Sequence, residues 1–132
     1  MSSTSNQLFA NIHKSDPLQF WANHGLNYSR VTDFLDFDTN ELSKLGGISK
    51  KSVRLDSRIP HDLKDRLEQI ANICNLVAEY FAADSQKTAL WFHTINPMLG
   101  DISPRDMIRL GRYKRLLKFV TEARSEHAPI QT

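Results

Sequence analysis

The amino-acid sequence predicts an all-α protein, and three observations support this prediction. From residue 60 to residue 81, apolar side chains recur every three or four residues, which is the spacing of one face of an α-helix about 30 Å long. Several shorter stretches with the same spacing follow a serine, aspartate or asparagine that is suited to capping a helix. No stretch alternates apolar and polar residues for long enough to predict a sheet.

The length and composition indicate an ordinary globular domain. The chain has 132 residues, of which 40% are hydrophobic and 24% are charged. No stretch approaches the roughly 20 apolar residues that span a bilayer, and the N-terminus lacks the basic start and apolar centre of a signal peptide. We therefore expect a cytoplasmic protein with no membrane partner. The formal net charge of +2 permits contact with nucleic acid without requiring it.

The chain divides into four predicted segments. Residues 1–16, rich in serine, threonine and asparagine, are predicted to be a flexible arm. Residues 17–58 are predicted to form short helices that include a helix-turn-helix-like region. Residues 59–83 form the predicted long connecting helix, and residues 84–132 form a small helical C-terminal region.

The first short helix is predicted over 17–24. Asp16 followed by a proline is typical of a helix start, and Gly25 is expected to end the helix. Phe20 and Trp21 would supply its buried face. A further helical turn, capped by Ser29, is predicted from the spacing of Val31, Phe34 and Leu35.

A helix-turn-helix outline follows. Asp38 and Glu41 have the spacing of a capping box, and the helix that they begin is expected to bury Leu42 and Leu45 and to stop at Gly46-Gly47. Ser49 is expected to cap a second, basic helix over 50–55. A helix, a glycine turn and a capped basic helix are typical of this motif.

The C-terminal region is predicted to contain three helices. The first begins at Asp84 or Ser85 and runs to about His93; a loop with proline and glycine follows. The second begins at Ser103-Pro104 and stops at Gly111, and the third runs from Arg112 to about Glu126.

Catalytic chemistry is not expected. The chain has no glycine-rich phosphate loop and no paired-histidine motif, and its five histidines are scattered. Its carboxylates are spread along predicted solvated helix faces rather than converging. The single cysteine, Cys74, excludes an intramolecular disulfide and a cysteine-based metal cage, and is expected to be buried in the long helix. We therefore expect neither an enzyme nor a bound cofactor or metal.

The first candidate site is basic. The N-terminal residues of the second helix of a helix-turn-helix face base edges, while hydroxyls at its start bind phosphate. An alternative is a solvated surface helix, and Asp56 close by would face phosphate unfavourably. The predicted DNA-binding residues are Lys44, Ser49, Lys50, Lys51, Ser52 and Arg54.

The second candidate site spans residues 96–119. Apolar residues alternate there with several arginines and lysines, and prolines and glycines restrict the backbone. One interpretation is that the apolar residues are core and the basic ones keep the surface soluble. The other is a rigid, net-positive docking surface for an acidic partner.

At these residues the sequence resembles the toxin-binding domain of Xre/MbcA/ParS-type antitoxins. The resemblance is carried by Asn96-Pro97-x-Leu99-Gly100, by Ser103-Pro104, and by Gly111-Arg112 before an apolar helix. It extends upstream, where residues 42–54 resemble the Xre-like helix-turn-helix of the family and residues 60–81 its connecting helix. Between Arg54 and Pro60 the chain is a few residues shorter than the family pattern, and residues 1–30 have no counterpart in it.

The resemblance implies an antitoxin whose C-terminal domain, here residues 84–132, covers the active site of an NAD-consuming RES-domain toxin. It also implies that the helix-turn-helix binds operator DNA, so that the complex represses its own operon. Pro97, Gly100 and Gly111 would shape the backbone rather than touch the toxin. The residues that the resemblance assigns to toxin binding are Trp91, Asn96, Leu99, Arg109, Arg112, Tyr113 and Arg115.

Two other functions remain open at this point. One is a helix-turn-helix transcriptional regulator whose C-terminal domain only dimerises, and the other is a helical adaptor with neither property. A homodimer is expected from the long helix and from the apolar residues between 8 and 21. A hetero-oligomer with the toxin is expected as well.

Overall fold

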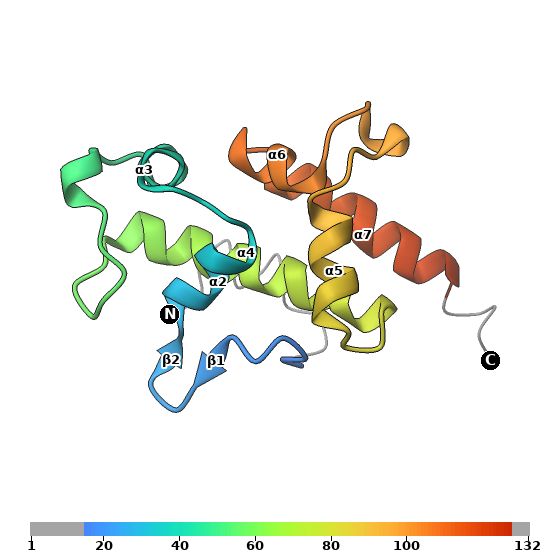
Figure 1. Ribbon diagram of the computed structural model, residues 1–132, viewed down its shortest axis with the longest axis horizontal. Coiled ribbons are helices and arrows are strands. Elements are labelled where there is room, and N and C mark those ends of the chain that lie inside the picture. Colours follow the sequence, from blue (N-terminus) through green and yellow to red (C-terminus); the bar gives the residue numbers. More distant parts are fainter. Residues whose placement is uncertain (1–14, 128–132) are drawn as a thin grey trace.

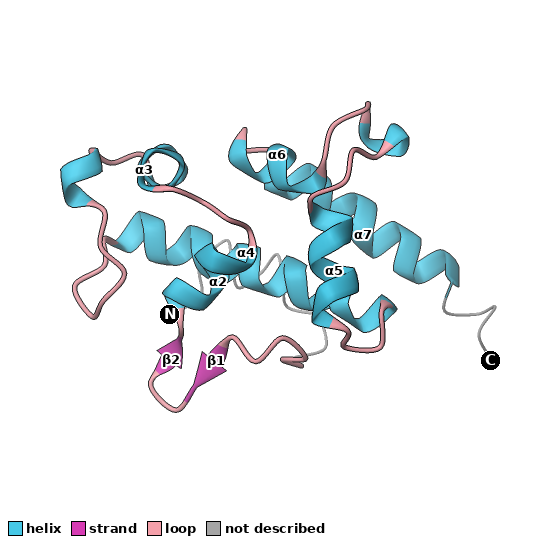
Figure 2. Cartoon of the chain, viewed as in Figure 1, coloured by secondary structure: helices cyan, strands magenta, loops and turns pink. Residues whose placement is uncertain are grey.

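The computed structural model describes residues 15–127 of the chain. This part contains six α-helices, two short 3₁₀ helices and one small β-hairpin (Figures 1 and 2). The prediction of an all-α protein is therefore right for most of the described chain and wrong for the hairpin. Residues 1–14 of the predicted flexible arm, and the tail 128–132, lie outside the described residues.

The central element is α4, His61–Tyr80, which runs through the middle of the molecule (Figure 1). Its buried face includes Leu63, Leu67, Ile70 and Cys74, each fully buried. The long helix predicted from the apolar spacing is confirmed. Helices α2 and α3 pack against α4, as do α5 and α7, so one helix supports both halves of the described chain.

Helices α2, Tyr28–Phe34, and α3, Thr39–Gly46, cover the N-terminal half of α4. The cap of α2 is Asn27 rather than the predicted Ser29; its side chain accepts a hydrogen bond from the amide of Arg30. The predicted capping box is confirmed at the start of α3, where Asp38 and Glu41 each accept a hydrogen bond from the other's amide, at 2.7 and 3.0 Å.

Gly46 allows α3 to approach α4 closely. A Cβ atom at this position would lie 3.0 Å from Cβ and 3.3 Å from Cα of Leu63. We predict that Gly46→Ala lowers the free energy of unfolding by about 1–2 kcal/mol, because the overlap outweighs the better helix propensity of alanine. Urea unfolding measures this, with Lys44→Ala on the exposed side of α3 as the control. A Gly46→Ala variant as stable as the wild type would show that the two helices separate without cost.

The helix predicted over 17–24 is absent; a hairpin takes its place. Strand β1, Trp21–Ala22, pairs with β2, Gly25–Leu26. The carboxylate of Asp16 accepts hydrogen bonds from the amides of Phe20 and Trp21, at 2.8 and 2.9 Å, and from the side chain of Asn75 on α4. The left-handed conformation of Gln19, with φ of 59°, is incompatible with a right-handed helix.

The hairpin also changes the argument for a homodimer. Leu18 and Phe20 are buried in the chain's own core rather than exposed on an arm. The backbone amide of Leu18 donates to the side chain of Asn75, which fixes this segment on α4. These apolar residues therefore do not supply a surface for a second copy, and the expected homodimer stays a prediction without their support.

The prediction of a second helix in the helix-turn-helix-like region is also wrong. Only one 3₁₀ turn forms, η1, Lys50–Ser52, and Val53 after it is extended. The hydroxyl of Ser49 lies 3.0 Å from that of Ser52 and does not cap the turn. Asp56 binds the side chain of Arg54 and accepts from the amide of Arg58, which stabilises an irregular turn instead.

The three helices predicted in the C-terminal region are confirmed as α5, Ser85–Phe92, α6, Pro104–Arg109, and α7, Tyr113–His127. Asp84 caps α5 and Ser103 caps α6 through their side chains. A 3₁₀ turn, η2, Pro97–Leu99, lies in the loop between α5 and α6. Helix α7 contributes Tyr113, Leu116, Leu117 and Val120 to the core, as its spacing predicts.

Arg105 ties α6 to the connection between α2 and α3. Its guanidinium donates to the carbonyl oxygens of Leu35 and Asp36 and to the carboxylate of Glu41, at 2.5, 2.6 and 2.9 Å. The same group lies 4.9 Å from the ring centroid of Phe37. Since the arginine is on α6 and its partners lie near α3, this contact fixes the C-terminal helices against the N-terminal ones.

Cys74 lies fully buried in α4, as predicted. Burial raises the pKa of its thiol, because the thiolate would be far from water. We predict that a thiol reagent such as 5,5′-dithiobis(2-nitrobenzoic acid) reacts with the folded protein only at the rate of unfolding, and reacts at once in denaturant. Rapid reaction under native conditions would contradict this packing.

No helix in residues 15–127 is both long enough and apolar enough to cross a membrane.

Candidate protein-docking surface

The loop between α5 and α6 is closed by its own hydrogen bonds. The backbone amide of Asn96 donates to the carbonyl of Ile102, at 3.1 Å, and the Asn96 carbonyl accepts from the amide of Asp101. The side chain of Asn96 caps η2 by accepting from the amide of Met98. Gly100 follows with φ of 88°, a conformation that favours glycine. The loop therefore has a defined shape.

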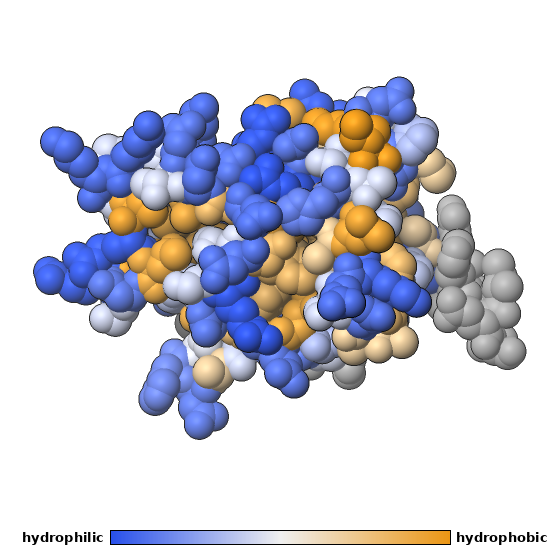
Figure 3. Space-filling view, in the orientation of Figure 1, coloured by the Kyte–Doolittle hydropathy of each residue, from blue (hydrophilic) through white to orange (hydrophobic). Residues whose placement is uncertain are grey.

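This closed loop and the adjacent end of α5 expose large apolar side chains. Leu90 is 68% exposed, Ile95 is 64% exposed and Met98 is 78% exposed. Figure 3 shows hydrophobic surface over this part of the molecule, at the upper right. We call Leu90, Ile95 and Met98 the apolar docking surface. These three side chains lie within nine positions of the chain, and contiguous exposed apolar patches mark sites of protein–protein interaction.

The predicted toxin-binding residues Trp91, Asn96 and Leu99 belong to the frame of this surface. Trp91 is half-buried, with its ring centroid 5.0 Å from that of Phe92. Asn96 closes the loop, as described above, and Leu99 is half-buried against the core. These three side chains therefore support the apolar docking surface. The residues of that surface, Leu90, Ile95 and Met98, are their neighbours in the sequence.

The other predicted toxin-binding residues lie on α6 and α7. Tyr113 is buried beneath Arg66 of α4, whose guanidinium carbon is 4.2 Å from the tyrosine ring centroid. Arg109 pairs with Asp106 at 3.0 Å. Arg112 and Arg115 are exposed. The predicted set is thus spread over α5, the following loop, α6 and the start of α7, and one of its members, Tyr113, is buried.

Leu90 and Ile95 lie outside the second candidate site, whereas Met98 lies inside it but is not among the residues assigned to toxin binding. Leu90 and Ile95 flank Trp91 and Asn96, and Met98 occupies the variable position of the Asn-Pro-x-Leu-Gly motif. An apolar residue at helical spacing usually indicates core, so the sequence contained no sign of their exposure. Their large exposed fractions in the structure show that these side chains point outward.

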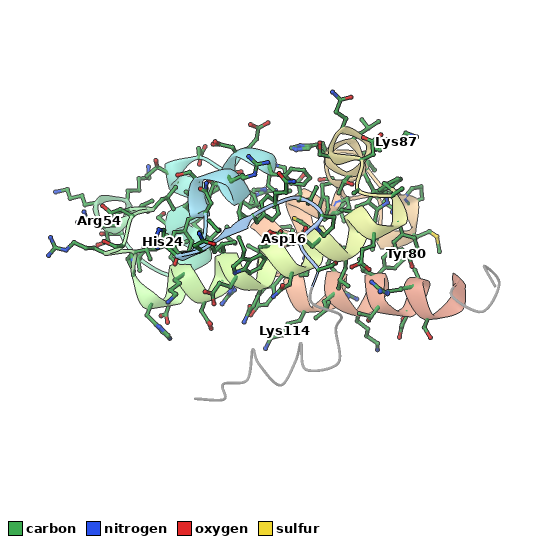
Figure 4. The ribbon with its side chains drawn as sticks, turned by 90° about the horizontal axis from the view of Figure 1, so that it is seen from below. Asp16, His24, Arg54, Tyr80, Lys87 and Lys114 are labelled. Carbon is green, nitrogen blue, oxygen red and sulfur yellow. The ribbon has the colours of Figure 1, made fainter. Side chains whose placement is uncertain are left out.

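The predicted DNA-binding residues lie at the opposite end of the molecule. Figure 4 shows Arg54 at one end and Lys87 of α5 towards the other. Arg54 is bound to Asp56 through two hydrogen bonds, of 2.8 and 2.6 Å. These bonds lower the pKa of Asp56 to about 2, so the carboxylate stays charged at neutral pH. All six predicted residues are exposed: Lys44, Ser49, Lys50, Lys51, Ser52 and Arg54.

This arrangement differs from a DNA-reading helix. The 3₁₀ turn of three residues presents no helical face to a major groove, and Asp56 compensates the charge of the arginine nearest to it.

Within the described residues, no three histidine, cysteine, aspartate or glutamate side chains come close enough to hold a metal ion.

Comparisons of the chain with protein-family models, with curated proteins and with solved structures find no match.

Proposed function

We propose that this chain is a protein-binding antitoxin. Its apolar docking surface would cover the active site of an NAD-consuming RES-domain toxin. The observation that carries the proposal is the exposure of Leu90 near the end of α5 and of Ile95 and Met98 on the adjacent loop, which is closed by hydrogen bonds. A rigid loop loses little conformational entropy on binding, and apolar side chains leaving water supply affinity.

The identity of the partner rests on the resemblance of residues 96–112 to the antitoxin domain. The motif residues have structural reasons to be present: Asn96 closes the loop, Gly100 adopts a left-handed conformation and Ser103 caps α6. A motif that builds the frame, with variable apolar residues on its outside, suits a family whose members bind related partners.

The alternative, a transcriptional regulator acting through a helix-turn-helix, has less support. The second helix is replaced by a 3₁₀ turn, and Arg54 is engaged by Asp56. The antitoxin proposal does not depend on this region.

The proposal is tested by co-expressing the chain with a RES-domain protein. We expect a stable complex in which amide hydrogen exchange slows in residues 90–102 and not in residues 49–58. Point variants are preferable to a truncation, because removing α7 would take Tyr113, Leu116, Leu117 and Val120 out of the core. A complex whose protection lies elsewhere would disprove this docking mode.

A further inference from the structure

The exposed face of α7 carries positive charge. Arg112, at the start of the helix, and Lys114, Arg115 and Lys118 within it are all exposed. They occupy about two turns, and the first carboxylate after them in the sequence is Glu122. We call these four residues the cationic face.

The four cations have no partner within the chain, as far as it is described. No ion pair or side-chain hydrogen bond joins any of them to residues 15–125, whereas Arg105, Arg109 and Arg124 are each paired with a carboxylate. The chain has a formal net charge of +2, so without these four cations it would be −2. The net positive charge of the chain thus depends on these four cations.

The position of this charge is unfavourable for the helix itself. Lys114 and Arg115 lie in the first turn of α7, which contains no acidic residue. The amide groups at a helix N-terminus repel cations. The cations therefore do not serve helix stability.

The cationic face also lacks an apolar centre. The large apolar side chains that are exposed in the described part lie at the end of α4, on α5, in the following loop and at the end of α6. Stable protein–protein interfaces have an apolar core, whereas a phosphate backbone is bound through charge alone. A face that offers only cations therefore suits nucleic acid better than protein.

The cationic face is separate from the apolar docking surface. Figure 4 shows Lys114 of α7 and Lys87 of α5 on opposite sides of the molecule. Leu90 lies about one turn after Lys87 on α5.

We propose that the cationic face binds the phosphate backbone of double-stranded nucleic acid without reading its sequence. The inner side of α7 is buried through Leu116 and Val120, and the helix packs against α4, so only its outer side chains can contact nucleic acid. This proposal does not rest on the antitoxin function. It also differs from the DNA contact expected from the sequence, since it moves that contact from residues 44–54 to α7.

The test measures fluorescence anisotropy of two labelled 25-base-pair DNA duplexes of unrelated sequence with the full chain. We expect both duplexes to bind with dissociation constants within about threefold of each other at roughly 50 mM salt. Affinity should fall with salt, with a log–log slope no steeper than about −3.6, because four cations neutralise at most four phosphates.

The matched variants each change the charge by the same amount. Lys114→Glu with Arg115→Glu is expected to weaken binding at least tenfold without lowering Tm, since glutamates suit the first turn of a helix. Lys50→Glu with Lys51→Glu is expected to weaken it less than threefold.

Three results would overturn the proposal. The first is an equal loss in both variants, which would indicate a general effect of net charge. The second is a preference of tenfold or more for one duplex, or no binding to either. The third is displacement of the duplex by polyglutamate at equal charge concentration, which would identify acidic protein as the partner.

Discussion

Replacing Ile95 and Met98 together with serine is expected to weaken binding to the proposed RES-domain partner by about 100-fold or more. Each side chain is mostly exposed in the free protein, and burying a methionine or isoleucine stabilises a complex by roughly 1.5–3 kcal/mol. The dissociation constant is measured by isothermal titration calorimetry. Because neither side chain contributes to the core, Tm should change by less than about 2 °C.

The control for this variant is Lys50→Ser with Lys51→Ser. It also truncates two exposed side chains, at the other end of the molecule, and should leave the partner's affinity within about twofold. If the Ile95 and Met98 variant bound the partner as tightly as the wild type, the apolar docking surface would not be the contact. A weakened complex with a lowered Tm would instead indicate that the loop had unfolded.

Replacing Arg105 with methionine is expected to lower the free energy of unfolding by about 2–3 kcal/mol. The side chain is 17% exposed, and its loss leaves the carbonyls of Leu35 and Asp36 and the carboxylate of Glu41 without their donor. Urea unfolding measures the change. Arg105→Lys should recover part of the loss, because one ammonium group can reach only some of these acceptors.

Arg112→Met is the matched control for Arg105. It removes an exposed arginine seven positions later and should change stability by less than about 0.5 kcal/mol. Glu41→Gln, made in the wild type and in Arg105→Met, completes a double-mutant cycle. The cycle isolates the ion pair between Arg105 and Glu41 from the two carbonyl contacts. Equal stability of the Arg105 and Arg112 variants would show that the connection between α2 and α3 does not need α6.

Local patterns in the sequence predict most of the helices. The spacing of Leu63, Leu67 and Ile70 identifies α4, and the residues Asp38 and Glu41 identify the start of α3. Ser103 followed by proline identifies the start of α6. These features depend on residues within a few positions of each other, so the sequence contains them directly.

The hairpin and the 3₁₀ turn could not be predicted in the same way. Asp16 looks like a helix cap, yet its carboxylate also binds Asn75, which is 59 residues away. That contact, with Phe20 buried in the core, outweighs the local preference for helix. After η1, Asp56 binds the side chain of Arg54 and the amide of Arg58, and these bonds stabilise a turn in place of the predicted helix.

The sequence predicts the residues that close the loop of the candidate docking surface, but not the exposure of the side chains around them. Asn96 and Leu99 have the conformation that their motif suggests, but the exposure of Ile95 and Met98 depends on how the loop closes. The contacts of Arg105 could not be predicted from local patterns either, because its partners lie about 64 to 70 positions earlier in the chain.

The most direct test of the antitoxin proposal is a titration of NAD consumption by the RES-domain partner. We predict that the rate falls linearly as the chain is added and reaches zero at a fixed stoichiometric ratio, and that the Ile95 and Met98 variant leaves the rate unchanged at the same concentrations. Undiminished NAD consumption in a mixture that forms a stable complex would contradict the proposal, since the partner's active site would then be open.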